Sequence, residues 1–310
     1  RGQNILLLGG NIDLIENSIS VVGGRLQLAG LSEAGTISLS SRNGLLRAAL
    51  PESIVRSDIS LSRGAQILAS GPEESINVAA RHLTLSSEPG GTLNEQTAIL
   101  SGALPGLLLP YQIGDVNIDA TGDVRLVDSN IYSAISIGAT GRTGDINFKS
   151  RSLYLTDSSQ IATTGLGTGD SGDLNVEVEQ NIFLDGKNSR PDRLTGLYSL
   201  LGDLTFGTGN GQAGDLTIQT NSLDVINGAL VSASTLGEGD AGQIMIVADE
   251  RMLIDGVSSL TGVASSISSS VEFTGRGDGG SIDITTPLLT IDRGGAIFGR
   301  TQGDGNAGSI

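Results

Sequence analysis

The sequence contains no cysteine and no tryptophan, and its 310 residues include only 5 Phe, 4 Tyr and a single histidine, His82. A chain without cysteine forms neither a disulfide scaffold nor a thiol-based active site. One histidine argues against a zinc cluster and against a Ser-His-Asp triad on this chain. The scarcity of aromatic rings predicts a narrow core filled by Val, Ile, Leu and Ala.

Positive charge is also scarce, with 18 Lys and Arg against 34 Asp and Glu, a net charge of -16 and a pI near 4.3. This excess of negative charge repels phosphate backbones, so we expect no nucleic-acid partner. No stretch reaches the ~18 consecutive apolar residues of a membrane span. Hydrophobic residues nevertheless make up 38% of the chain, which is enough to build a folded core.

Glycine is abundant, with 46 residues, and it marks an internal repeat. The repeated signature is a glycine, usually a small polar residue, and then alternating apolar and polar positions. Its intervals are 30, 28, 42, 28, 38 and 28 residues, which indicate a period of 28 with insertions near 187–200 and 258–274. The signature occurs as GDVNI at Gly114, GDINF at Gly144, GDLNV at Gly172, GDLTI at Gly214, GQIMI at Gly242, GSIDI at Gly280 and GSI at Gly308.

One unit, residues 214–241, contains three short alternating runs separated by turn residues. Side chains alternate across a strand, so the apolar members of each run point to one side. A single unit cannot cover this apolar side, whereas stacked units can. We therefore predict an all-β parallel β-helix with ~28-residue coils of three short strands, about 11 coils in all, in which Leu216 lies against Ile244. A β-sandwich is the competing interpretation.

Residues 114–310 carry the regular coils, and residues 1–113 show the same alternation less regularly within one continuous solenoid. Strand starts are expected at Gly10, Gly24 and Gly35 and in the later DISL and SINV runs. The segment near 88–112 is expected to be a loop or a lateral cover.

These repeats resemble the filamentous-haemagglutinin-like exoproteins of two-partner secretion, particularly the cyanobacterial ones. The resemblance rests on GDLTIQTNSLDVINGALVSASTLGEGDAG, its echo GDINFKSRSLYLTDSSQIATTGLGTGDSG, and the N-terminal GGNIDLIENSISVVGGRLQLAGLSEAGTISL. It implies a right-handed β-helix that an outer-membrane transporter exports and that is secreted or displayed on the outer cell surface. The expected role is then a non-catalytic stalk, adhesin or fibre segment with a cell surface, a glycan or extracellular matrix as partner.

Aspartates recur in phase with the repeat, and four of them are candidate metal ligands: Asp170, Asp240 and Asp278 in the glycine-rich turn, and Asp173 after the signature glycine. Stacked on adjacent coils, two such charges ~4.8 Å apart repel by roughly 1 kcal/mol in water, which a calcium ion would relieve. The alternative is that these side chains cap turns through the backbone.

Other functions remain open from the sequence. A β-helical polysaccharide lyase or hydrolase could use the pairs Asp170/Asp173 or Glu177/Glu179 as acid and base. A glycan-binding module would use exposed aromatic residues, for which the candidates are Tyr132, Tyr154, Tyr198 and Phe206. We expect no catalysis, recognition by the two insertions, and self-association of rods end to end or side by side.

Overall fold

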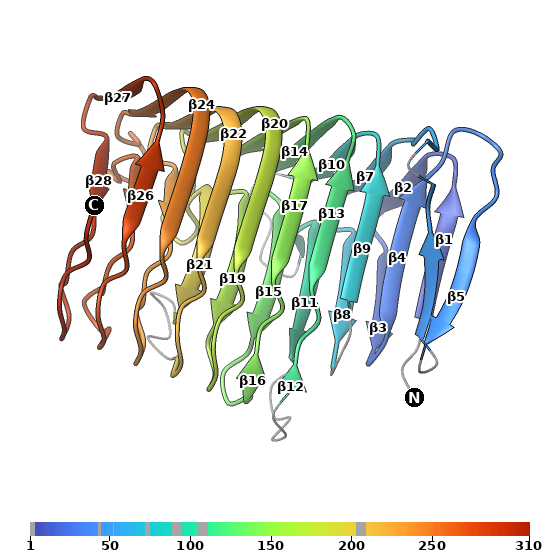
Figure 1. Ribbon diagram of the computed structural model, residues 1–310, viewed down its shortest axis with the longest axis horizontal. Coiled ribbons are helices and arrows are strands. Elements are labelled where there is room, and N and C mark those ends of the chain that lie inside the picture. The colour runs from blue at the N-terminus through green and yellow to red at the C-terminus, as the bar shows by residue number, and fades with distance from the viewer. Residues whose placement is uncertain are drawn as a thin grey trace.

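The computed structural model describes residues 4–42, 45–51, 53–71, 75–88, 95–103, 111–202 and 209–310. Within these ranges there is no α-helix, and no segment forms a helix that could cross a membrane. The chain is all-β, and its two large sheets contain only parallel strand pairs, which confirms the predicted class. Figure 1 shows the strands side by side along the long axis in chain order.

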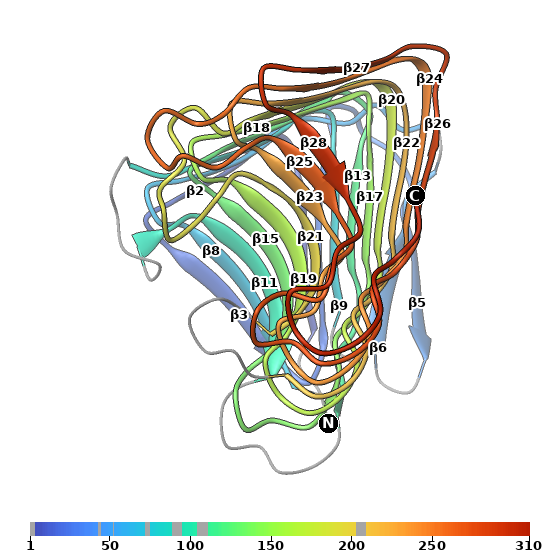
Figure 2. The ribbon, with the colours of Figure 1, turned by 90° about the vertical axis from the view of Figure 1, so that its left-hand side faces the viewer.

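Each repeating unit contributes a first, a second and a third strand, and every strand pairs with its counterpart in the next unit. Leu216 pairs with Ile244, as the 28-residue period predicts. Viewed along the stack, the units enclose a narrow interior between two sheets (Figure 2). The first and second strands form one 15-stranded sheet, and the third strands form a 9-stranded sheet.

The strand bounds follow this order. The first strands are β1 (Asn4–Gly9), β4 (Arg25–Gly30), β9 (Ser75–Ala80), β13 (Val116–Ala120), β17 (Ile146–Ser150), β20 (Leu174–Asp185), β22 (Leu216–Ile226), β24 (Ile244–Asp255) and β26 (Ile282–Thr285). The second strands are β2 (Ile12–Ile15), β7 (Ile59–Ser62), β10 (Leu83–Ser86), β14 (Asp123–Val127), β18 (Ser152–Thr156), the later parts of β20, β22 and β24, and β27 (Leu289–Asp292). The third strands are β3 (Ser18–Val22), β8 (Gln66–Ser70), β11 (Ala98–Ala103), β15 (Asn130–Ile135), β19 (Gln160–Gly165), β21 (Gly196–Leu201), β23 (Leu230–Ser232), β25 (Ser266–Ser268) and β28 (Ala296–Phe298).

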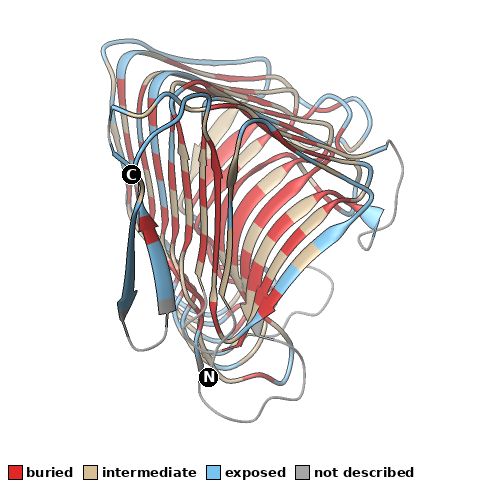
Figure 3. Cartoon of the chain, turned by 90° about the vertical axis from the view of Figure 1, so that its right-hand side faces the viewer, coloured by how far each residue is buried: buried red, intermediate tan, exposed pale blue. Residues whose placement is uncertain are grey.

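The core is a set of aliphatic columns, because the inward position of each strand repeats from unit to unit. Buried and more exposed positions alternate along the strands in Figure 3. Leu216, Leu223 and Val231 are fully buried and belong to one continuous cluster that runs through the stack. In the last unit Leu289 and Ile291 are 42% and 46% exposed, because β27 pairs with β24 on one side only.

The described residues form nine stacked units, one for each strand of the 9-stranded sheet, whereas length divided by period predicts about 11. Eight steps of ~4.8 Å give a stack of about 38 Å. Part of the difference lies in residues 31–58, where the strand expected at Gly35 leaves the stack. It forms an antiparallel hairpin of β5 (Ser38–Arg42) and β6 (Leu45–Ala49), beside the body in Figure 2.

Two contacts fix this hairpin segment to the stack. The buried Gln27 side chain donates to the Ala48 carbonyl oxygen (2.8 Å) and accepts from the Ala48 amide (3.0 Å). Arg56 reaches from the end of the segment to the Asp119 carboxylate (2.6 Å) on β13. The alternation after Gly35 therefore predicts a strand correctly. That strand, β5, pairs with β6 and not with a strand of the stack.

The predicted cover and insertions contain strands of the third sheet. β11 lies inside the segment 88–112, of which residues 89–94 and 104–110 are outside the described part of the chain. The first residues of β21 lie inside 187–200, and β25 lies inside 258–274. The loops that leave the stack are thus shorter, 186–195 and 256–265, and both join a second strand to a third. A small sheet of β12 (Tyr111–Gln112) and β16 (Gly141–Arg142) completes the described strands.

Candidate functional site

Two ladders of polar side chains run along the glycine corner, the turn between the third strand of one unit and the first strand of the next. In the first ladder each side-chain oxygen accepts a hydrogen bond from the backbone N–H of the next member. The donor–acceptor distances are 2.9, 3.0, 2.7 and 2.9 Å along the series Asp170, Gln212, Asp240, Asp278 and Asn306. Each acceptor therefore holds two adjacent units together.

The second ladder repeats this arrangement three residues further along each unit. Its distances are 3.0, 2.9, 2.9 and 2.8 Å along the series Asp115, Asp145, Asp173, Asp215 and Gln243. At its first member, burial raises the pKa of Asp115 and repulsion from Asp145 acts in the same direction, against the hydrogen bond that the Asp145 amide donates. The charged form of Asp115 is therefore less favourable here than in water.

The predicted calcium ligands divide between these ladders: Asp170, Asp240 and Asp278 on the first and Asp173 on the second. Each has a backbone partner one unit further along. Neutral amides occupy equivalent positions, and the Gln212 side-chain oxygen accepts from the Asp240 amide as a carboxylate does. The repeat thus requires an acceptor oxygen rather than a charge. Across the described ranges, no group of three or more His, Cys, Asp or Glu side chains could hold a metal ion.

We expect Asp173→Asn to leave the stability nearly unchanged, because the side-chain oxygen of the asparagine still accepts a hydrogen bond from the backbone N–H of Asp215. Asp173→Ala should lower the free energy of unfolding by about 1 kcal/mol, the usual net value of one hydrogen bond. Urea titrations with and without a chelator would measure both effects. A chelator-induced loss of stability in the wild type that disappears in Asp173→Asn would establish a calcium site instead.

The carboxylate pairs considered for acid–base catalysis either accept hydrogen bonds between units or lie on the exposed face of a strand. Asp170 and Asp173 belong to different ladders and face different backbone donors. Glu177 pairs with Lys149 on the neighbouring strand (2.8 Å), and it lies with Glu179 on the exposed face of β20. Among the described residues, the two acids of each pair do not hydrogen-bond to a common side chain.

The three aromatic candidates that the structure describes, Tyr132, Tyr154 and Tyr198, do not form a flat sugar-binding platform. Tyr198 is buried, Tyr132 donates to the Gln160 side-chain oxygen, and burial raises the pKa of both phenols. The Arg125 guanidinium lies 4.0 Å from the ring centre of Tyr154. Phe183 contacts the same ring from the next unit, at 6.4 Å between ring centres, and Phe206 lies outside the described residues.

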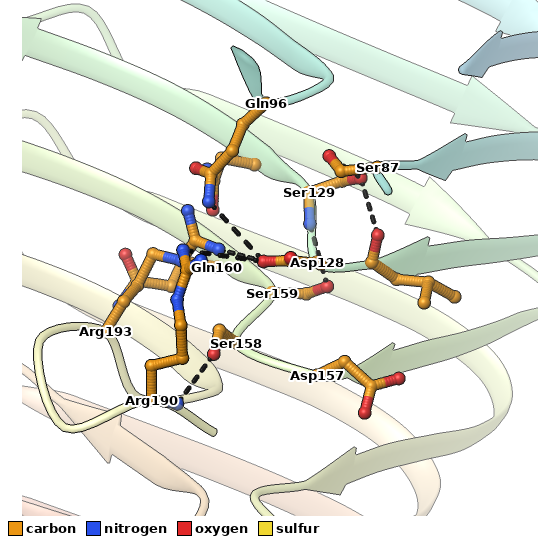
Figure 4. Close-up of polar contacts among 12 residues, drawn as sticks. Ser87, Gln96, Asp128, Ser129, Asp157, Ser158, Ser159, Gln160, Arg190 and Arg193 are labelled. Carbon is orange, nitrogen blue, oxygen red and sulfur yellow. Dashed lines mark hydrogen bonds and ion pairs between the residues drawn. The ribbon is translucent and has the colours of Figure 1, made fainter. Parts of the chain in front are cut away.

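The loop 186–195, here called the strap, folds back over two earlier units instead of projecting as a recognition loop. The Arg193 side chain, 3% exposed, pairs with the Asp128 carboxylate 65 residues upstream (Figure 4). The Arg190 guanidinium approaches the same carboxylate at 3.7 Å, and the Arg190 amide donates to the Ser158 hydroxyl (2.8 Å). Burial lowers the pKa of Arg193, although the neighbouring Asp128 favours its charge.

The strap also covers a buried polar network that begins in the loop before β11. The Gln96 side chain donates to Asp128 (3.4 Å) and accepts from Asn130 (2.7 Å), and all three residues are buried. Two nitrogens of Arg193, Nε and Nη1, are buried without a hydrogen-bond partner among the described residues. The strap is therefore a structural clamp whose main contacts are internal.

The second insertion, 256–265, packs differently. Val257 pairs with Ala264 in an isolated antiparallel bridge, and Ser258 is buried beneath the loop. Leu260 at its tip is 64% exposed. Val257 is also exposed, at 46%, so this loop presents apolar side chains to solvent.

His82 has a structural contact that its place in the sequence does not reveal. The half-buried imidazole accepts a hydrogen bond at Nδ1 from the Asp123 amide (2.9 Å), which links β10 to β14. The same backbone segment donates from the His82 amide to Asp58 (3.2 Å). We therefore assign His82 to unit stacking.

Acid should destabilise the fold through carboxylates held by arginines. The Arg81 guanidinium forms two bonds with Asp58 (2.8 and 2.6 Å) and lowers the pKa of that carboxyl, and Arg293 does the same for Asp255. A carboxylate with a lowered pKa contributes stability above its unfolded pKa of about 3.9 and loses it as pH falls through the folded value. We expect the unfolding temperature to fall below about pH 4, and less steeply in Asp58→Asn. An unchanged unfolding temperature between pH 5 and pH 3 would contradict this.

Comparison with known proteins adds no relative: no protein-family model, no curated protein and no solved structure matches the chain.

Proposed function

We propose that this chain is a non-catalytic, right-handed parallel β-helical segment of a large secreted or cell-surface protein of the filamentous-haemagglutinin type. It would act as an elongated stalk, adhesin or fibre. The support is the use of the repeated carboxylates, since the two ladders place Asp and Gln interchangeably as acceptors between units. Catalytic acids occupy specific positions and are not replaced by amides from one repeat to the next.

The stacking also suits a spacer. Each unit contacts its neighbours through the same aliphatic columns, and the ladders join the units from Asp115 onward, so length grows by adding units. The two arginines of the strap, Arg190 and Arg193, are turned toward the buried Asp128 carboxylate. In this proposal the export partner is an outer-membrane transporter of two-partner secretion, and a chain without cysteine suits passage in the unfolded state.

The proposal predicts surface exposure and no turnover. Protease treatment of intact cells of the source organism should remove the protein, while a periplasmic marker survives as the control for membrane integrity. Incubation with a panel of polysaccharides should release no new reducing ends and no unsaturated products. Protection of the protein on intact cells would refute the location, and turnover abolished by Asp170→Asn would establish the alternative of a carbohydrate-active enzyme.

A further inference from the structure

A furrow runs along the glycine corner, parallel to the axis of the stack. It consists of two adjoining hollows of about 600 and 270 Å³, which share Thr274 and Arg276 in their lining. The larger hollow begins beside Ile137 in the unit of β13, and the smaller ends beside Asp304 in the last unit. The furrow therefore spans several stacked units on one edge of the rod.

One wall of the furrow is a third ladder, whose members differ in side chain from unit to unit. Successive members are joined by parallel bridges and are all exposed: Thr168, Asn210, Glu238, Arg276 and Asp304. The Asn210 amide donates to Glu238 (3.1 Å), and the Arg276 guanidinium lies 3.5 Å from Asp304. Hydrogen-bond donors and acceptors thus follow one another at the ~4.8 Å spacing of the units. Unlike the two aspartate ladders, this one makes no uniform bond that the repeat requires.

The smaller hollow has an exposed aromatic side chain in its lining. Phe273 is 77% exposed, and no other aromatic side chain whose burial the structure describes is exposed. Water solvates such a ring poorly, and ligand sites combine aromatic side chains with a few polar groups in the way this hollow does. The π face of the ring is electron-rich and suits the C–H groups on the flat face of a pyranose.

The same hollow contains an acceptor that has no protein partner. The Gln302 Oε1 atom is buried and has no hydrogen-bond partner within the part of the chain that the structure describes. A buried unpaired acceptor costs about 1–3 kcal/mol unless a donor reaches it. This oxygen does not itself face the hollow, so a rotation of the Gln302 side chain would bring it to a ligand hydroxyl, which would be such a donor.

The furrow suits a polymer that bonds through hydroxyl groups rather than through a peptide backbone. The corner amides of Asn210, Glu238 and Arg276 already donate to carbonyl oxygens of the preceding unit (2.9, 2.8 and 2.8 Å), so these residues offer a peptide no free backbone donor. A polyanion is disfavoured by the net charge of -16 and by Glu238 and Asp304 in the wall itself.

We propose that this furrow binds a neutral, linear polysaccharide. Phe273 stacks on one sugar ring, Gln302 and Arg276 bond hydroxyls of that ring, and Glu238 and Asn210 bond those of the following rings. The proposal rests on the proposed adhesive function and extends it, because it names the chemical class of ligand to which the protein would adhere.

Isothermal titration with cellohexaose, xylohexaose and mannohexaose tests this site. We expect at least one hexasaccharide to bind, and Phe273→Ala and Arg276→Ala each to weaken it by about tenfold or more, equivalent to about 1.4 kcal/mol. Leu260→Ala is the matched control, since that side chain is 64% exposed on the loop at the other end of the third strand and should change the affinity less than twofold. Both substituted side chains are exposed, so unchanged melting curves would show that the fold is retained.

Three outcomes would overturn the assignment: no hexasaccharide binds the wild type, Phe273→Ala binds as tightly as Leu260→Ala, or only a heparin hexasaccharide binds. Chromatography of the sugars after incubation separates this proposal from the previous one. If the sugar is cleaved and its binding still depends on Phe273 and Arg276, the non-catalytic function is refuted and the binding site stands. Absent binding by a protein that is displayed on cells would refute the site and keep the function.

Discussion

Arg193→Ala will lower the free energy of unfolding by about 3 kcal/mol, the lower end of the range for a broken buried ion pair, because the buried Asp128 carboxylate keeps only the more distant Arg190 guanidinium and the Gln96 amide. The side chains are only 3% and 8% exposed, so water cannot replace the lost partner. The substitution should also release the strap, because Arg193 holds that loop over the two preceding units. Denaturant titration followed by circular dichroism measures it.

Lys149→Ala is the matched control. It also breaks an ion pair between adjacent units, but the side chains of Lys149 and Glu177 are 53% and 58% exposed. Exposed pairs contribute about 1 kcal/mol or less. Equal effects of Arg193→Ala and Lys149→Ala would show that the strap pair is not buried in solution.

Gly239→Ala will destabilise the stack by more than about 4 kcal/mol, in the range reserved for severe steric faults. Gly239 lies in the glycine corner with φ of +148°, a conformation that side chains rarely adopt. A Cβ atom there would overlap the Gly211 carbonyl oxygen of the unit below, and backbone cannot move aside without opening the stack. Thermal unfolding would report this as a large fall in the midpoint, or as failure to fold.

Gly262→Ala separates the two causes of that effect. Gly262 also has positive φ, +70°, but an added Cβ would meet no atom within 4 Å. Its cost should be only the conformational one, about 1–2 kcal/mol. If both substitutions cost the same, close approach between units at the glycine corner is not what the repeat requires.

Much of this architecture follows from the sequence because each unit obeys the same pattern. The inward columns follow from alternation, and the pairing of Leu216 with Ile244 follows from the period. The sequence predicts the acceptor role of Asp173 only in part. The recurrence of aspartate at this position shows that the repeat needs it, but does not show which group it faces. Gln212 and Gln243 stand at positions that other repeats fill with aspartate. This replacement of a carboxylate by an amide was the sequence signal that the position needs an acceptor oxygen and not a charge.

The rest depends on contacts that no local pattern encodes. Alternation after Gly35 predicts a strand but cannot say whether its partner is the stack or an adjacent hairpin strand. Asp128 and Arg193 are 65 residues apart and lie in turns of different units. Phe273 stands in a Ser-rich segment interpreted as part of an insertion, and only the stacking of units brings it into one hollow with Gln302 of the last unit.

Disulfide trapping between β22 and β24 tests most directly whether units stack in the 28-residue register. The chain has no cysteine of its own, so Thr217→Cys with Met245→Cys introduces a single pair at positions that face each other. Strand spacing places their Cα atoms ~4.8 Å apart, whereas Thr217 and Val247 are about 8 Å apart, beyond the ~7 Å that a disulfide spans. We predict rapid oxidation of the 217/245 pair and little of the 217/247 pair. Equal oxidation of the two pairs, or none in the first, would contradict the stacked architecture.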